Sequence, residues 1–95
     1  LELVLLQHPD IHEVAVVALA SREWGETPLA VVVRESGAIS DAKTLRLWAN
    51  DRLGKTQRIS QLVFTEALPK SSIGKVLKRE LRDTYAGLAD QAPEA

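Results

Sequence analysis

Two short runs without a polar side chain, Val14–Ala20 and Leu29–Val33, constrain this chain most. Both are far shorter than the roughly 20 residues that cross a membrane as a helix. Valine-rich runs of this length are typical of strands that are buried on both faces. We therefore predict strands over Ile11–Ala20 and Leu29–Arg34. They would pair as a hairpin across the connection Ser21–Pro28, in which a glycine and a proline break the pattern.

Three helices are predicted around these strands. The first ends at about His8, because Pro9 follows it. The second begins after Ser40, a good N-cap residue, and ends at Gly54. The last runs from about Lys75 to Ala86. Apolar residues at helical spacing give the last two helices a core face: Leu45, Trp48, Ala49 and Leu53 on one, and Leu77, Leu81, Tyr85 and Leu88 on the other.

A third strand is predicted over Gln61–Glu66, with Leu62 and Phe64 on one side and Val63 on the other. The order is then helix, strand, strand, helix, strand, helix. This order predicts a small α/β domain of α+β character, in which three helices pack on a mixed three-stranded sheet. We expect residues 1–87 to form this domain and residues 88–95 to be a frayed acidic tail.

Length and composition exclude several classes of protein. A chain of 95 residues is one domain. It has no cysteine, which excludes disulfide scaffolds and Cys-based metal sites. His8 and His12 lie on either side of Pro9, so they cannot share a helix face as a zinc pair, and we expect no metal site. The first residues do not have the pattern of a secretory signal. These features predict a soluble cytoplasmic domain without a membrane span.

Charge is unevenly distributed along the chain. The segment 54–82 has seven basic and two acidic residues, whereas the whole chain has a net charge of −1. Such a segment indicates either an anionic partner, such as a phosphate-bearing small molecule, or a solvated helix face. Nucleic acid is disfavoured as the partner because aromatic residues are sparse, with one Phe and one Tyr.

The most informative stretch is residues 68–82, which read LPKSSIGKVLKRELR. Gly74 allows a close bend of the backbone before Lys75, and the lysine can place a point charge against a phosphate. The stretch is not a Walker A loop, because proline stands at position 69 where a glycine is required. Ser72 to Lys75 match S-x-x-K, but the chain is too short for the other motifs of a serine acyl enzyme.

The same stretch resembles the end of the C-terminal domain of the acyl- and aryl-CoA synthetases, within the adenylate-forming superfamily. That family carries a pattern like L-P-[KR]-[ST]-x-x-G-K-[IV]-x-[KR]-[RKE]-x-L-R. The segment Leu5–Val17 resembles the family's first helix and strand. Trp24-Gly25-Glu26 with the run Leu29–Val33 resembles its next turn and strand. The resemblance covers residues 1 to about 85 in the right order.

The resemblance implies a ligase that activates a carboxylic acid with ATP to an acyl-adenylate and then transfers the acyl group to coenzyme A, as in fatty acid metabolism. A large N-terminal domain would hold the acid and ATP with Mg, and the small C-terminal domain would rotate between two poses. The lysine at position 75 would stabilise charge as pyrophosphate leaves, on a loop supported by Gly74. The family motifs upstream of this region are not in the sequence, so we expect an excised or truncated domain, or an unusual standalone fragment, that is inactive alone.

Two further residues are implied as contacts of coenzyme A, namely Trp24 and Arg58. An indole ring supplies apolar packing and a guanidinium binds a phosphate. The sequence departs from the family here, because Thr56-Gln57-Arg58-Ile59 replaces an aromatic-Lys-x-Pro run. The alternative without a functional role is that Trp24 is a loop aromatic that covers the sheet. For Arg58 the same alternative is a solvated residue at the start of a strand.

The resemblance also implies regulation, since relatives of this kind are switched off by acetylation of the lysine that matches Lys75. A lysine acetyltransferase and a deacylase are therefore expected partners. One alternative from a different class stays open, namely a noncatalytic binding or regulatory module with a basic anion-binding face.

Overall fold

The computed structural model describes residues 2–21, 25–54 and 58–90 of the chain. Its elements are α1 (Glu2–Leu6), β1 (Ile11–Ser21), β2 (Gly25–Arg34), α2 (Ala42–Arg52), β3 (Gln61–Phe64), α3 (Lys78–Thr84) and the 3-10 helix η1 (Ala86–Asp90). The strands form one sheet in the order β1-β2-β3. The β1–β2 pair is antiparallel and the β2–β3 pair is parallel. The predicted fold class and order of elements are therefore confirmed.

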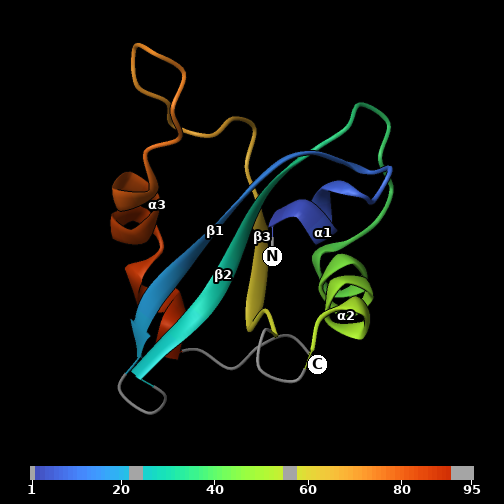
Figure 1. Cartoon of the computed structure of the whole chain (residues 1–95), viewed down its shortest axis with the longest axis horizontal. Coiled ribbons are helices and arrows are strands. Elements are labelled where there is room, and N and C mark those ends of the chain that lie inside the picture. Colours follow the sequence, from blue (N-terminus) through green and yellow to red (C-terminus); the bar gives the residue numbers. More distant parts are fainter. Residues whose placement is uncertain (1, 22–24, 55–57, 91–95) are drawn as a thin grey trace.

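Helices cover both faces of this sheet (Figure 1). On one face α3 contributes Leu81 to a core cluster with Ala15, Val17, Leu19, Leu29, Val31, Val33 and Leu68. On the other face α1 and α2 contribute Leu5, Leu45 and Ala49 to a cluster with Ile11, Ala30, Val32, Ile59 and Leu62. The central strand β2 supplies residues to both clusters, as its apolar run predicts. The edge strand β1 is covered less evenly, because Ala18 and Ala20 are exposed.

β2 begins earlier than predicted, at Gly25, and it runs through Pro28. The expectation that Pro28 lies in a connection is wrong. Its carbonyl oxygen accepts a hydrogen bond of 3.0 Å from the Ser60 N–H, on the β3 side of the strand. The N–H that proline lacks would point to the same side, where β3 pairs only from Leu29 onwards. The proline therefore removes no hydrogen bond from the β1–β2 ladder.

Asp41 is the N-cap of α2, so the prediction of Ser40 as the cap is wrong. The Asp41 side chain accepts from the Thr44 N–H at 2.7 Å. Hydrogen bonds from the Thr44 side chain and backbone lower the pKa of the Asp41 carboxyl. The Ser40 hydroxyl instead donates to the Asp10 carboxylate, and this bond lowers the pKa of Asp10. Ser40 thus ties the loop before α2 to the start of β1.

The C-terminal region differs from its prediction in two places. β3 ends at Phe64, and α3 begins at Lys78 instead of Lys75. Leu88 in η1 packs against the α3-side core cluster, and its carbonyl oxygen accepts from the Gln61 side chain. Of the expected acidic tail, residues 91–95 lie outside the described part of the chain.

Candidate functional site

The loop between β3 and α3 is a short hairpin, seen in orange at the top of Figure 1. Lys70 and Val76 form an antiparallel bridge at its base. The Leu77 N–H donates to the Pro69 carbonyl oxygen at 2.9 Å. Nearer the tip, the Ser71 N–H donates to the Lys75 carbonyl oxygen at 2.8 Å. A helix that began at Lys75 would use the Lys75 carbonyl oxygen for its first intrahelical bond, and the bond from Ser71 occupies this oxygen, in agreement with the later start of α3.

Gly74 closes the turn at the tip of this hairpin. Its N–H donates to the Ser71 carbonyl oxygen at 2.9 Å, and its φ is 84°. This left-handed conformation favours glycine. A Cβ at position 74 would meet no atom within 4 Å. The requirement for glycine is therefore conformational and not one of space, in agreement with the bend that the sequence predicts.

Lys75 follows directly, and two hydrogen bonds join its backbone to Ser71 on the other arm of the hairpin. Its N–H donates to the Ser71 Oγ at 3.3 Å, while its carbonyl oxygen accepts from the Ser71 N–H. The side chain itself is exposed. No residue in the described ranges forms an ion pair with its ammonium group. The chain thus presents a cation on a backbone of fixed shape, beside a shallow surface depression that α3 also lines.

Two other lysines of the basic segment are paired with carboxylates near the N-terminus. Lys70, at the base of the hairpin, forms an ion pair with Glu13 in β1. Lys78, at the start of α3, lies 3.1 Å from a carboxylate oxygen of Glu2. The same oxygen accepts from the Val16 N–H at 2.7 Å, on the edge strand β1. The hairpin is therefore attached to the N-terminal elements on both sides of Lys75. No local sequence pattern predicts these pairs, because the partners lie far apart in the chain.

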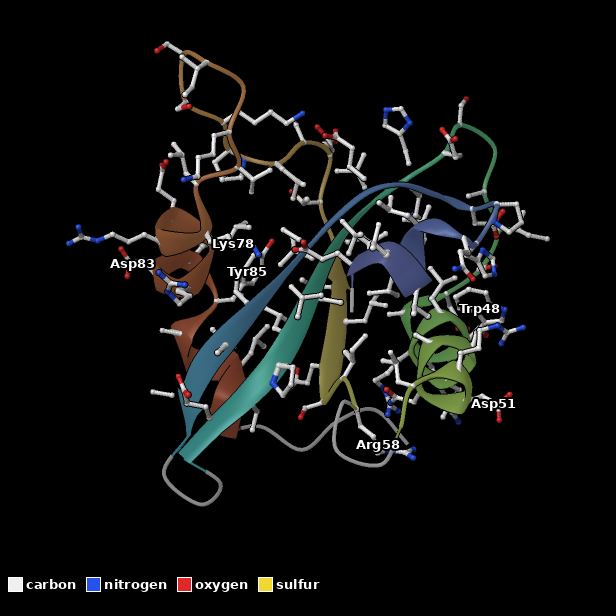
Figure 2. The ribbon with its side chains drawn as sticks, in the orientation of Figure 1. Trp48, Asp51, Arg58, Lys78, Asp83 and Tyr85 are labelled. Atoms are coloured by element: carbon white, nitrogen blue, oxygen red, sulfur yellow. The ribbon has the colours of Figure 1, made fainter. Side chains whose placement is uncertain are left out.

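Arg58 lies at the opposite end of the molecule from the hairpin base. Figure 2 places Arg58 near the lower end of α2 and Lys78 beside the upper part of α3. The Arg58 side chain is exposed and lines an open, shallow groove of about 720 Å³ with α2 residues. Trp24 lies outside the described residues. The structure therefore does not bring Arg58 and Lys75 into one site.

An aromatic contact on the α2 side was not predicted. The Arg52 guanidinium lies 4.0 Å from the centre of the Trp48 ring, a cation–π distance. The His8 ring meets the same indole edge-on, with centroids 4.8 Å apart. Trp48 and Arg52 line the groove that contains Arg58. Helical spacing predicts that Trp48 faces the core, and its partial burial agrees with this prediction.

The described residues include side chains that suit a phosphate, but no cluster of metal ligands. Across residues 2–21, 25–54 and 58–90, no three His, Asp or Glu residues are grouped to hold a metal ion. The exposed ammonium of Lys75 and the guanidinium of Arg58 do fit phosphate groups. Within the same ranges, the helices are too short and too polar to span a membrane.

Comparison with known proteins links this geometry to one group of enzymes. The family model described as "AMP-binding enzyme C-terminal domain" matches residues 1–75. The chain is 42% identical over 85 residues to 4-coumarate–CoA ligase-like 3 of Oryza sativa subsp. japonica, covering 90% of this chain and 14% of that protein. It is 37% identical over 81 residues to 2-succinylbenzoate–CoA ligase of Geobacillus kaustophilus, covering 85% of this chain and 16% of that protein.

Solved structures agree with these relatives. Apo MatB from Rhodopseudomonas palustris matches with a TM-score of 0.88 and 31% identity, covering 94% of this chain and 18% of that one. The amide bond synthetase McbA from Marinactinospora thermotolerans matches with a TM-score of 0.81 and 33% identity, covering 88% and 17%. The chain therefore spans less than one fifth of the length of each of these proteins.

Proposed function

The chain belongs to the AMP-binding enzyme C-terminal domain family, and from this membership we propose that it is the lid domain of an ATP-dependent, AMP-forming acid–CoA ligase. A large N-terminal domain would bind the carboxylic acid and ATP with Mg. In the first half-reaction a carboxylate oxygen attacks the α-phosphorus of ATP, and pyrophosphate leaves. In the second, the sulfur of CoA attacks the acyl carbonyl carbon, and AMP leaves.

The observation that carries the proposal is the Lys75 hairpin. Its ammonium is exposed and has no ion-pair partner among the described residues, and its backbone is bonded to Ser71 in both directions. A cation brought to the phosphates of ATP from this hairpin would stabilise the negative charge that develops as pyrophosphate leaves. The role is electrostatic and not nucleophilic, and it depends on the charge of the ammonium group. Because Lys75 would act through its charge, acetylation of Lys75 would turn adenylation off. Acetylation removes both the charge and the ammonium donors.

The position of Arg58 is consistent with a second pose of the lid. It lies at the end of the domain away from the hairpin base (Figure 2). One orientation would bring Lys75 to ATP, and another would bring the Arg58 groove to the channel for CoA. In that orientation the Arg58 guanidinium binds a phosphate of CoA, and Trp24 is the proposed apolar neighbour of the nucleotide.

A second candidate function concerns the acceptor in the second half-reaction. McbA, which shares this fold, is named an amide bond synthetase. An amine acceptor would also release AMP from the acyl-adenylate, but it would not need a phosphate-binding arginine. Arg58→Ala separates the two functions, since it weakens turnover with CoA in the first case and leaves turnover with an amine unchanged in the second.

A noncatalytic module with a basic anion-binding face is the remaining alternative. Its proposed face is smaller than the sequence suggests, because Lys70 and Lys78 are paired with Glu13 and Glu2. Such a module would leave Lys75 without an effect on acid activation.

Lys75→Ala in the full-length enzyme tests the proposal. Removal of a positioned charge from a transition state costs about 10² to 10³ in rate. We expect this loss in adenylation, measured as pyrophosphate release. We expect thioester formation from a supplied acyl-adenylate to be nearly unchanged, because the lid is then in its other pose. Arg79→Ala is the matched control, since Arg79 is an exposed cation of the same surface depression. Equal loss of both half-reactions in Lys75→Ala would assign Lys75 a structural role.

A further inference from the structure

Asn50 is the buried polar residue of the described core. Its exposed fraction is 4%, and every other buried side chain in the described ranges is apolar. Asparagine is a poor helix former, yet Asn50 lies within α2 beside the core residue Ala49. Burial of a carboxamide is unfavourable unless both its oxygen and its nitrogen are hydrogen-bonded. Its partners therefore indicate what it does.

Both partners belong to a single residue, Ile59. The Asn50 Nδ2 donates to the Ile59 carbonyl oxygen at 2.9 Å, and the Asn50 Oδ1 accepts from the Ile59 N–H at 2.7 Å. This is the pair of bonds that an adjacent strand would provide. The Ile59 side chain is 1% exposed in the cluster beneath α1 and α2. Residue 59 is thus fixed through its backbone and its side chain, two residues before β3 begins.

Arg58 directly precedes this fixed residue. The Ile59 N–H that Asn50 binds belongs to the peptide group joining residues 58 and 59. Restraint of this peptide restrains the direction in which the Arg58 side chain leaves the backbone. Asn50 and Arg58 also line the same groove, Asn50 from within α2 and Arg58 from the returning chain.

We infer that Asn50 is a positioning residue for Arg58, and that it sets the affinity of the enzyme for the phosphate-bearing acceptor. The inference rests on the proposed function, in which Arg58 binds a phosphate of CoA. Without Asn50, two buried backbone groups of Ile59 lose their partners and the local backbone relaxes. Arg58 then samples several directions, and binding requires it to be ordered again.

The test uses Asn50→Ala, Arg58→Ala and the double variant in the full-length enzyme. We expect each single variant to raise the KM for CoA about three- to tenfold, the range for loss of a partly exposed charged contact. The double variant should match Arg58→Ala, because Asn50 acts through Arg58. The kcat of adenylation should stay within about twofold in all three variants, since Lys75 lies elsewhere.

A matched control separates positioning from general destabilisation. Val63→Ala removes part of a half-buried side chain from β3 on the opposite face of the sheet, away from Asn50. It should lower the Tm without a change in the KM for CoA. Should Asn50→Ala fail to fold, Asn50→Ser keeps a hydroxyl for one of the two bonds and should give an intermediate KM.

Three results would overturn the inference, and they are distinguishable. An unchanged KM in Arg58→Ala would remove the CoA role of Arg58 and the inference with it. A raised KM in Arg58→Ala with a normal KM in the folded Asn50 variant would overturn the inference alone. Equal changes of KM in the Asn50 variant and in Val63→Ala would show that Asn50 acts only through stability.

Discussion

Lys70 and Lys75 are five residues apart on one hairpin, but their amines have different surroundings. Lys70 is bound to the carboxylate of Glu13, whereas Lys75 has no ion-pair partner among the described residues. The contact with Glu13 holds the Lys70 amine against β1, which leaves it less accessible to an enzyme than the Lys75 amine. We expect an acetyltransferase to modify Lys75 faster than Lys70, with adenylation falling in proportion to Lys75 modification. Mass spectrometry of the full-length enzyme and a parallel pyrophosphate assay measure both quantities.

The outcome depends on which lysine carries the modification. Removal of the charge and donors of Lys75 abolishes its contact with an anion. Modification confined to Lys70 would contradict the expectation, as would complete modification of Lys75 with activity retained. Lys70→Arg serves as the control, since it keeps the charge that pairs with Glu13 and cannot be acetylated by the same chemistry.

The residues of the candidate site differ in how well the sequence predicts them. Gly74 and Lys75 are adjacent, so a local motif is sufficient to find them. Asn50 and Glu13 are not part of any local motif. Each becomes informative only through a partner, Ile59 in the first case and Lys70 in the second. A polar residue beside the apolar face of a predicted helix was the available signal for Asn50.

At the scale of elements, the boundary between the hairpin and α3 is the main error of prediction. Apolar residues at helical spacing extend back to Leu77, and this pattern predicts a helix that begins at about Lys75. The bond from the Leu77 N–H to Pro69, together with the left-handed Gly74, gives residues 70–76 a hairpin instead. Helical periodicity is a local pattern, and it does not detect pairing across a turn. Lys75 is consequently placed by a hairpin and not by a helix terminus.

The attachment of this hairpin to β1 gives a prediction for the element as a whole. Glu13→Gln removes the ion pair with Lys70, and an exposed pair of this kind changes an equilibrium by about two- to fivefold at most. We expect adenylation to slow by up to this factor, while thioester formation is unchanged. Glu35→Gln is the matched control, because it removes the His12–Glu35 contact at the same end of the β1–β2 ladder without touching the hairpin.

Reversal of the charges offers a stricter form of the test. Lys70→Glu combined with Glu13→Lys restores an ion pair of opposite orientation, so adenylation should recover relative to either single change. Two outcomes would show that the Lys70–Glu13 pair does not position the hairpin. One is a double variant whose adenylation does not recover, and the other is a defect in Glu35→Gln as large as that in Glu13→Gln.

For the whole molecule, the layered architecture is predictable because apolar patterning determines it. β2 must be buried on both faces, and helices with one apolar face must cover them. The separation of Arg58 from the Lys75 hairpin, the two candidate site regions, does not follow from patterning. Arg58 precedes β3 and the hairpin follows it, so β3 together with the segment after it carries the chain from one end of the molecule to the other (Figure 1). Only the direction of β3, parallel to β2, fixes which end receives each group.

The isolated 95-residue chain should fold without the rest of the enzyme. Its two core clusters are complete within the described residues, and its radius of gyration is 12.8 Å, close to the roughly 13 Å of a compact 100-residue domain. We expect cooperative thermal unfolding, measured by circular dichroism. We also expect no pyrophosphate release from ATP with any carboxylic acid, because the ATP and acid sites are proposed for the N-terminal domain and the lid supplies only the Lys75 ammonium. The full-length enzyme is the positive control. Pyrophosphate release by the isolated chain above background would contradict the division of labour proposed for the two domains, and a noncooperative melt would contradict the independence of the fold.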